Sequence, residues 1–302
     1  MNNILIIGLG SIAMKHIEVL KEINSAFSFF ALRSNPGSNI IPNVKNLYNL
    51  KDVKKRGFLF AIISSPSYRH YKDIVKLSKL NIPLFVEKPL CINLYQLNKI
   101  KKMRFSHPVY HALNLRFHPL LNFTKKYLSD KREKIYEINC YFGSFLPEWR
   151  DNIDYKKNYS IYKKMGGGVH LDLIHEPDYI HYLFGSPLST DRRYRKTSHL
   201  EGDSFDAAQI NMHYKNFSVN IMLNYFRKDP KRQMEIVNKD CTLRLDFLKN
   251  NVKNLTTDEV LFEDHNSMRK SYKDQMINFL SSLNRNGCSF KFKNVESLSL
   301  IL

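Results

Sequence analysis

The sequence predicts an α/β protein of two domains, the first with a doubly wound parallel sheet and the second an α+β domain with a mostly antiparallel open sheet. Its 302 residues exceed what one hydrophobic core usually holds. The first third alternates strand-like and helix-like patterns, whereas strand-like alternation dominates after about residue 120. We place the boundary after residue 118, which gives domains of residues 1–118 and 119–302.

The first domain begins with NILIIG, an apolar run that ends in glycine and is typical of a buried parallel strand. Apolar side chains then recur at helical spacing over residues 11–23, where we expect Ser11 to cap the first turn. Further strands are predicted within 27–34, 57–65 and 82–89, and a helix within 69–80. This repeated strand–helix–strand order favours a parallel sheet with right-handed crossovers.

The second domain shows antiparallel signals. Alternating runs cover 133–145, 205–226 and 241–248, and the second of these contains a Lys-Asn pair that predicts a hairpin turn. A late helix is predicted within 265–283, and the apolar stretch 293–302 is helix-like, so we expect a carboxyl terminus shorter than is usual for such a domain.

The formal net charge of +19 is the unusual feature of the composition. Because the lysines are spread along the chain and no nucleic-acid-binding motif accompanies them, we predict no nucleic-acid partner. A basic surface suits an anionic cofactor or a phosphorylated substrate. No apolar run reaches the length of a membrane helix and no signal peptide is evident, so we expect a cytoplasmic protein without a membrane partner.

The cysteines and the histidines show no metal-ligand spacing. We therefore predict no metal site, and we expect reduced, structural thiols at four widely separated positions: Cys91, Cys140, Cys241 and Cys288.

A dinucleotide-binding motif lies between the first strand and the first helix. Gly8, Gly10 and Ala13 occupy the small-residue positions of G-x-G-x-x-G/A. Gly8 permits a tight turn, and Gly10 allows the backbone to approach a pyrophosphate at the helix amino terminus, where Ser11 and Ile12 begin. This indicates a Rossmann domain that binds a nicotinamide dinucleotide; the alternative is a tight turn without a ligand.

The end of the second strand predicts which dinucleotide is preferred. NAD-binding proteins usually carry an acidic residue there, but here Arg33 and Ser34 stand in its place. A guanidinium group matches a 2′-phosphate in charge and geometry. We therefore predict a preference for NADP over NAD, with NAD as the second possibility and a surface arginine as the alternative interpretation of Arg33.

A set of further motifs extends over nearly the whole chain: SSPSYRH, EKPL, NLRFHP, GGG followed by D-x-x-H-x-x-D and LFG, and EIVNKDCTLRLD. With these motifs the sequence resembles the Gfo/Idh/MocA family of nicotinamide-dependent oxidoreductases, which act mostly on sugars, cyclitols and their derivatives. The segment LPEWRDNIDYKKNYS resembles a subgroup from bacterial surface-polysaccharide and nonulosonic-acid gene clusters.

The resemblance implies hydride transfer between the cofactor and a secondary alcohol or ketone of a sugar, amino sugar or nucleotide sugar. It implies that Lys88 of EKP lies beside the nicotinamide, where a lysine at a strand end can stabilise a developing alkoxide. Pro89 follows it, in a peptide bond that is cis in many family members. The alternative is a solvated strand end. Further cofactor contacts are predicted for four residues: Ser65, Pro66, His70 and Glu87.

The resemblance also implies that His175 is the acid/base on the substrate hydroxyl, a role that suits the ordinary pKa of histidine. Asp172 is expected to orient or polarise the substrate, although it precedes His175 by three residues instead of the usual four. Pro177 suits the first turn of a helix, so Asp172 is expected in an extended or irregular segment. His170 and Glu176 are alternatives for the polar contact.

Substrate contacts are predicted at two places, NLRFHP and LPEWR, with five candidate residues: Asn114, Arg116, His118, Trp149 and Arg150. A tryptophan beside an arginine suits stacking on a sugar face and recognition of an anion; an interface anchor between subunits is the alternative for Trp149. Tyr155 and Tyr159 are weaker candidates. We expect the glycines at 166–168 to allow close backbone approach to substrate or cofactor.

Two other functions remain open: an NAD-dependent glycoside hydrolase of the same fold, and a non-catalytic NADP(H)-binding sensor or partner protein. By resemblance we expect a homodimer or homotetramer that packs through the exposed face of the second-domain sheet.

Overall fold

The computed structural model describes residues 2–37, 40–129, 135–151, 154–283 and 292–302. It divides the chain into two compact units. Unit 1 comprises residues 1–113, 272–295 and 302, and unit 2 comprises 114–271 and 296–301. The first segment of unit 1 ends five residues before the predicted boundary at residue 118, and the chain returns to unit 1 after residue 271, within the range predicted for the second domain. Met276 and Phe279 are fully buried there, within its apolar core.

Unit 1 contains a seven-stranded parallel sheet in the order β15-β6-β5-β4-β1-β2-β3. The predicted strands are confirmed, because runs such as NILII and FAII are buried on both faces. Strand order reverses between β1 and β4, and ligands of open α/β sheets bind outside the carboxyl ends of such strands. The strands are β1 (Asn3–Ile7), β2 (Ser28–Leu32), β3 (Val44–Leu47), β4 (Phe60–Ile63), β5 (Leu84–Glu87), β6 (Val109–Ala112) and β15 (Phe292–Lys293).

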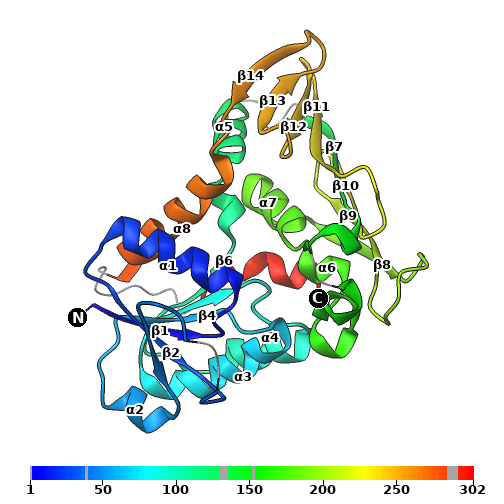
Figure 1. Ribbon diagram of the computed structural model, residues 1–302. Coiled ribbons are helices and arrows are strands. Elements are labelled where there is room, and N and C mark those ends of the chain that lie inside the picture. The colour runs from blue at the N-terminus through cyan, green and yellow to red at the C-terminus, as the bar shows by residue number, and fades with distance from the viewer. Residues whose placement is uncertain (1, 38–39, 130–134, 152–153, 284–291) are drawn as a thin grey trace. The chain divides into compact units, whose positions relative to one another are not determined.

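Helices cover both faces of this sheet (Figure 1). The helices α1 (Ser11–Ile23) and α8 (Ser267–Leu283, from Tyr272 on) pack on one face, and α3 (Ser67–Leu77) and α4 (Leu94–Lys102) on the other. The short elements of the unit are α2 (Leu50–Lys54) and η1 (Ser78–Leu80). On the α8 side, the Phe279 ring lies 5.0 Å from that of Phe60 and 5.2 Å from that of Phe85.

The start of α1 differs from the prediction. Gly10 is the N-cap residue, Ser11 is the first helical residue, and no side chain caps the helix. The predicted Ser11 cap is therefore wrong by one position. The unpaired N–H groups of the first turn remain available to a ligand.

Unit 2 contains an eight-stranded sheet in the order β14-β13-β12-β11-β7-β10-β9-β8. Every neighbouring pair is antiparallel except β7 with β10. The predicted hairpin is confirmed: β9 and β10 pair antiparallel, and Tyr214 donates its N–H to the carbonyl of Phe217 across the Lys215-Asn216 turn. The strands are β7 (Ile135–Gly143), β8 (Ser189–Arg195), β9 (Ala207–His213), β10 (Ser218–Asn224), β11 (Lys231–Asn238), β12 (Thr242–Asp246), β13 (Asn251–Asn254) and β14 (Glu259–Glu263). Residues 133–134 of the first predicted run lie outside the described residues.

Three helices pack on one face of this sheet and close an apolar core around Ile138, Ile210 and Leu243: α5 (Pro119–Tyr127), α6 (Val169–Asp172) and α7 (His175–Phe184). The opposite face is polar and carries a hollow of about 350 Å³, lined by residues that include Asn139, Asn211, Asn220 and Gln233. The 3₁₀ helices of the unit are η2 (Asn114–Phe117), η4 (Leu146–Glu148), η5 (Tyr155–Lys157), η6 (Tyr159–Ile161), η7 (Lys163–Met165) and η8 (Glu296–Leu300).

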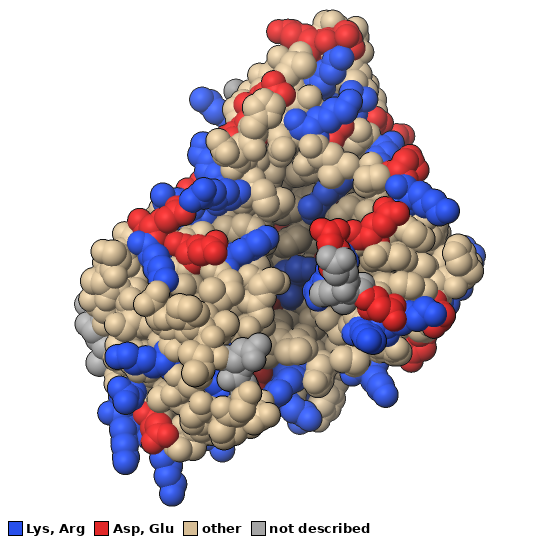
Figure 2. All heavy atoms as spheres, in the orientation of Figure 1, with Lys and Arg blue, Asp and Glu red and all other residues tan. Residues whose placement is uncertain are grey.

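On the face shown in Figure 2, lysine and arginine side chains are scattered with acidic side chains among them rather than gathered in one stripe. Among the described residues, no helix is long and apolar enough to cross a membrane. The same residues contain no group of three or more His, Cys, Asp or Glu side chains placed to hold a metal ion. Cys91, Cys140 and Cys241 are buried and free, and Cys288 lies outside the described residues.

Candidate functional site

The glycine loop after β1 packs against the loop after β4. Gly8 has a φ of +86°, and a Cβ atom there would lie 2.4 Å from the backbone of Ser65. Gly8 is thus required both by its backbone conformation and by this close approach. Around Gly10, by contrast, a Cβ atom would meet nothing within 4 Å. That open space lies at the amino terminus of α1, where N–H groups can bind an anion.

A pocket of about 230 Å³ lies beside this loop, entirely within unit 1. It brings together five of the residues predicted to bind the cofactor: Gly8, Arg33, Ser34, Ser65 and Pro66. Two further cations from α3, Arg69 and Lys76, also line it. The acid in the lining, Asp73, is buried and accepts a 2.6 Å hydrogen bond from the Ser65 hydroxyl. Three cations against one carboxylate give the pocket an excess of positive charge.

The remaining residues predicted for the cofactor are linked to this pocket through the backbone. The His70 ring lies 2.6 Å from the carbonyl oxygen of Ser65 and 2.7 Å from that of Pro89. Glu87 and Lys88 immediately precede Pro89 at the end of β5, and the Lys88–Pro89 peptide bond is cis. Ser11 and Ile12 form the first turn of α1. Lys88 itself is half-buried.

Asp172 and His175 lie on consecutive helices of unit 2. Asp172 is the last residue of the four-residue α6, and half-buried His175 is the first residue of α7, with Pro177 in its first turn as predicted. The expected extended or irregular conformation of Asp172 is wrong, because the helix breaks after it, at Leu173 and Ile174.

The Asp172 carboxylate is buried and held by two phenols. Tyr225 donates to Oδ2 at 2.6 Å, and Tyr159 donates to Oδ1 at 3.1 Å. The pKa of Tyr159 is raised mainly by the charge of Asp172 and secondly by burial. The pKa of Tyr225 is raised mainly by burial and secondly by the same charge. Both tyrosines therefore remain protonated donors at any pH the protein meets.

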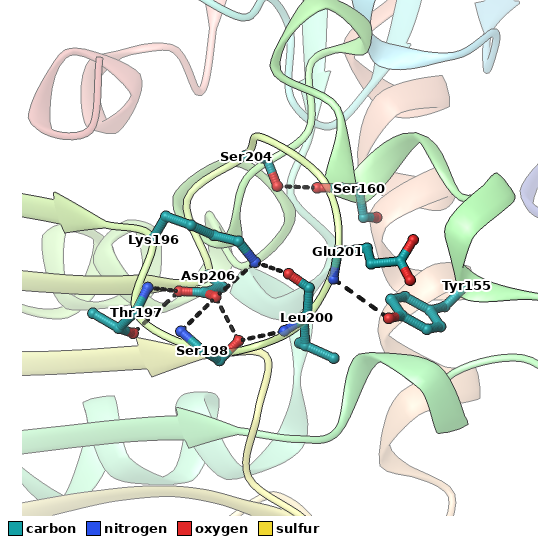
Figure 3. Close-up of polar contacts among 9 residues, drawn as sticks. All are labelled: Tyr155, Ser160, Lys196, Thr197, Ser198, Leu200, Glu201, Ser204 and Asp206. Atoms are coloured by element: carbon teal, nitrogen blue, oxygen red, sulfur yellow. Dashed lines mark hydrogen bonds and ion pairs between the residues drawn. The ribbon is translucent and has the colours of Figure 1, made fainter.

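The segment that carries Tyr159 is fixed by the loop 196–206 (Figure 3). The Ser204 hydroxyl donates to the carbonyl of Ser160 at 2.7 Å, and the Glu201 N–H donates to the Tyr155 hydroxyl at 3.4 Å. The loop is closed on itself by Asp206, whose carboxylate accepts from the backbone and hydroxyl groups of Thr197 and Ser198 and from Lys196.

Two acidic residues in the first turn of α7 form buried ion pairs. Arg116 binds both oxygens of Asp178, at 2.9 Å from Nε and 2.7 Å from Nη2. Arg232 binds Glu176 at 2.8 Å from Nε and 2.7 Å from Nη2. Because both carboxylates are fully buried, each pair restrains the first turn of the helix that begins with His175.

Three other candidates have structural contacts. Asn114 donates to the Ser271 hydroxyl at 2.9 Å. His118 is fully buried, caps α5 by accepting from the Leu120 N–H, and packs edge-on against Phe247. His170 stacks on Tyr194 with ring centroids 4.3 Å apart.

The tryptophan loop lies against the same tyrosine that binds Asp172. Trp149 donates its indole N–H to the Ser144 hydroxyl at 2.8 Å and packs edge-on against the Tyr225 ring at 5.3 Å. Arg150 beside it is exposed. Trp149 is half-buried.

The glycines at 166–168 serve the protein's own packing. Gly166 and Gly168 have φ of +77° and +134°, and a Cβ atom at Gly167 would lie 2.4 Å from the carbonyl oxygens of Tyr159 and Ser160. At Gly167 the close approach is to the segment that carries Tyr159, and the approach of this glycine run to substrate or cofactor remains a prediction.

The two units also match two family models. Residues 2–112 match the oxidoreductase family with an NAD-binding Rossmann fold, and residues 131–296 match the carboxyl-terminal α/β domain of that family. The chain belongs to the Gfo/Idh/MocA oxidoreductase family. No curated protein matches the sequence.

Solved structures of dehydrogenases and oxidoreductases share the fold over nearly the whole chain. The WlbA dehydrogenase from Bordetella pertussis, in complex with NADH and UDP-GlcNAcA, is 14% identical with a TM-score of 0.78, and the alignment covers 99% of this chain and 94% of that chain. An oxidoreductase from Thermotoga maritima is 15% identical with a TM-score of 0.79, covering 99% and 93%. The myo-inositol 2-dehydrogenase from Lactobacillus plantarum is 15% identical with a TM-score of 0.75, covering 99% and 93%. At these identities the likeness shows the fold alone.

Three residues of the candidate sites in this Gfo/Idh/MocA chain are not marked by any sequence motif. Arg69 and Lys76 lie within the predicted helix 69–80, but they are seven positions apart and no motif marks the face they share. Their spacing of seven, two helical turns, is the signal that could have suggested a common face. Tyr225 follows β10 and reaches Asp172 only through the tertiary fold.

Proposed function

We propose that this member of the Gfo/Idh/MocA family is an oxidoreductase that prefers NADP over NAD. The pocket of about 230 Å³ beside the glycine loop carries this proposal, because Arg33, Arg69 and Lys76 line it against the single carboxylate of Asp73. An adenosine 2′-phosphate adds negative charge where a cluster of cations stabilises it, and Arg33 can bind it with two parallel hydrogen bonds.

The described residues fit a dinucleotide. Gly8 and Gly10 would hold the pyrophosphate at the start of α1, and Arg33 with Ser34 would bind the adenosine ribose and its phosphate. When bound, the cofactor supplies the hydride or accepts it. The protein supplies the fixed turn at Gly8, the open backbone at Gly10 and the positive pocket.

In the proposed reaction Lys88 stabilises the alkoxide oxygen of the substrate, and His175 takes or returns the hydroxyl proton. Asp172 is proposed to orient the substrate through its fixed carboxylate. Support for Asp172 comes from the two phenols that hold both of its oxygens, which leaves its orientation well determined. Support for His175 comes from its half-buried position at the start of α7, next to the buried Glu176–Arg232 pair.

We propose a sugar, amino sugar or nucleotide sugar as substrate, in surface-glycan biosynthesis. The fold shared with a dehydrogenase bound to UDP-GlcNAcA supports a nucleotide sugar as the first compound to try. Exposed Arg150 beside half-buried Trp149 offers a cation and an aromatic face, a pairing that suits an acidic sugar. We rank three other candidates for substrate contact below Trp149 and Arg150, because each already has a hydrogen-bond partner within unit 2: Asn114, Arg116 and His118.

The proposed assembly is a homodimer or homotetramer through the polar outer face of the unit 2 sheet. That face carries the hollow lined by Asn139, Asn220 and Gln233. Replacing Asn220 with Glu introduces a charge there, so light scattering should show a smaller species than for the wild type. An unchanged mass would contradict this arrangement.

The function is tested by following nicotinamide absorbance with NADPH or NADP and a panel of UDP-linked keto sugars, uronic acids and amino sugars. The proposal predicts turnover with at least one compound, and loss of most of it in Lys88→Met and His175→Asn. Lys79→Met is the matched control, because Lys79 is exposed and lies outside the nucleotide pocket. Hydrolysis of a glycoside without net change in the cofactor, or ligand binding without any turnover, would contradict the proposal.

A further inference from the structure

Three buried histidines contact the four-residue segment Glu87–Leu90, which carries Lys88. They come from three different elements: His16 from α1, His70 from α3 and His111 from β6. We propose that these histidines are positioning residues that hold Lys88 in place for the reaction and link it to the nucleotide-binding loops. The inference rests on the role of Lys88 in the proposed function.

The first histidine binds the side chain that precedes Lys88. His16 Nε2 lies 2.6 Å from Oε1 of Glu87, while its Nδ1 is buried and has no hydrogen-bond partner among the described residues. Because an ionised carboxylate only accepts, His16 Nε2 is the donor of this hydrogen bond. The rings of Phe85 and Tyr272 enclose His16 edge-on at 5.0 and 5.9 Å.

Glu87 is thereby kept charged next to Lys88. Burial by itself raises the pKa of Glu87, but the hydrogen bond from His16 and the charges of His16 and Lys88 outweigh it, so that the pKa lies below its usual value. The second carboxylate oxygen accepts from the Lys88 N–H at 3.2 Å. Glu87 therefore fixes the backbone of Lys88 and places a negative charge beside it.

The second histidine connects two loops. His70 Nδ1 lies 2.7 Å from the Pro89 carbonyl oxygen, and its Nε2 lies 2.6 Å from that of Ser65. Both carbonyls only accept, so the neutral ring bonds one of them at a time and the protonated ring bonds both. Burial lowers the pKa of His70, while the carbonyls and the carboxylates of Glu87 and Asp73 act in the opposite direction. In either state the His70 ring lies between the Pro89 and Ser65 carbonyls and within 2.7 Å of both oxygens.

The third histidine anchors the end of the segment. His111 Nε2 accepts from the Leu90 N–H at 3.2 Å, and its Nδ1 donates to the Asn294 carbonyl at 3.0 Å. One neutral tautomer satisfies both contacts. Asn294 in turn donates its side-chain amide to the backbone carbonyl of His111 at 3.3 Å, which is a second hydrogen bond between these two residues.

These contacts fix the groups on both sides of Lys88 along the chain: the Glu87 carboxylate, the Pro89 carbonyl and the Leu90 amide. Catalytic groups must be held within about 0.5 Å of their working geometry, and neighbours with locked side chains do this. Since α1 also begins at the dinucleotide loop and Ser65 lines the nucleotide pocket, displacement of either loop would be transmitted to Lys88.

The test compares apolar and amide replacements by hydrogen exchange of the full-length protein without ligand. His70→Leu and His111→Leu should speed exchange in peptides covering residues 86–93 by roughly fivefold, the loss of one net hydrogen bond. His70→Asn and His111→Gln retain a polar atom near Nδ1 and Nε2 and should restore much of the protection. Phe279→Leu is the control for lost packing in the same unit. It should change the exchange rate of residues 86–93 by no more than that of the other strands of the parallel sheet.

The second readout uses the substrate that supports turnover. His16→Leu and His70→Leu should lower kcat by roughly tenfold or more with KM within about twofold, whereas His16→Gln and His70→Asn should recover part of kcat. Faster exchange spread evenly over the parallel sheet, or amide variants no better than leucine variants, would overturn the inference. If the wild type shows no turnover, the proposed function fails, and the exchange experiment still decides whether the histidines hold the segment.

Discussion

Tyr225 donates a 2.6 Å hydrogen bond from its phenol to Oδ2 of Asp172, and the carboxylate that it holds lies three residues before His175. Tyr159 donates to the other oxygen. A buried carboxylate without donors is costly, so these two hydrogen bonds stabilise the fold at a position where the sequence departs from the usual spacing of the family motif.

Removing the stronger phenol should cost stability. We expect Tyr225→Phe to lower the free energy of unfolding by about 2 kcal/mol, because one oxygen of a buried carboxylate loses its donor. Urea denaturation measures the change. Tyr179→Phe is the matched control: that phenol is equally buried but contacts the neutral Cys140 thiol, so its loss should cost about half as much. Equal effects of the two substitutions would contradict the assignment.

The two glycines of the dinucleotide motif should respond differently to alanine. At Gly8 the new Cβ atom would collide with Ser65 and the φ of +86° would be strained, so Gly8→Ala should reduce stability by roughly 2 kcal/mol or more. Gly10→Ala should leave the thermal midpoint of the ligand-free protein nearly unchanged, because its Cβ atom meets nothing within 4 Å. Gly10→Ala should nevertheless weaken nucleotide binding. Equal stability losses would show that the loop is not packed as described.

The α3 cations should distinguish the two nucleotides. We expect Arg69→Ala and Lys76→Ala to weaken NADPH binding by roughly three- to tenfold and NADH binding by less, with a smaller NADPH effect at high salt. Calorimetry at two salt concentrations measures both. Lys79→Ala removes a neighbouring exposed lysine outside this pocket and should change neither affinity. Parallel losses for both nucleotides would argue against a phosphate-specific role.

Two buried histidines predict acid sensitivity. Burial lowers the pKa of His118 and of His170 from 6.5 to about 4. Between these values the unfolded chain binds protons that the folded chain does not, so the free energy of unfolding falls as the pH drops from 6.5 to about 4. Each histidine can contribute up to about 3 kcal/mol of this loss.

Substitution isolates one of these contributions. His170→Phe retains an aromatic ring against Tyr194 but has no group that titrates. As the pH falls from 6.5 to about 4, the free energy of unfolding should therefore fall less in this variant than in the wild type. Urea denaturation at several pH values measures it. A difference that stays constant with pH would contradict a lowered pKa for His170.

The strands and long helices could be predicted because their apolar patterns are local. The run NILII is buried on both faces of the parallel sheet, and the helix predicted within 265–283 is found as Ser267–Leu283. The return of that helix to unit 1 could not be predicted, because the pattern shows that Phe279 is buried but not which core buries it. Ser11 was misplaced by one residue because Gly10, which has no side chain to cap with, takes the N-cap position.

The candidate sites were predictable only in part. The glycine loop and Arg33 follow from their positions beside strands, and the structure gathers Gly8, Arg33 and Ser65 in one pocket. The contacts of Asp172 depend on Tyr225, which lies 53 residues away. Such pairs depend on strand order and helix packing, which the spacing of residues along the chain does not predict.

The central claim is that the pocket beside the glycine loop binds NADP, and one titration tests it most directly. NADPH and NADH are titrated by calorimetry into the wild type and into Arg33→Asp. The account predicts that the wild type binds NADPH roughly ten- to hundredfold more tightly than NADH, and that Arg33→Asp removes or reverses this preference. Equal affinities in the wild type, or a preference unaffected by Arg33→Asp, would contradict it.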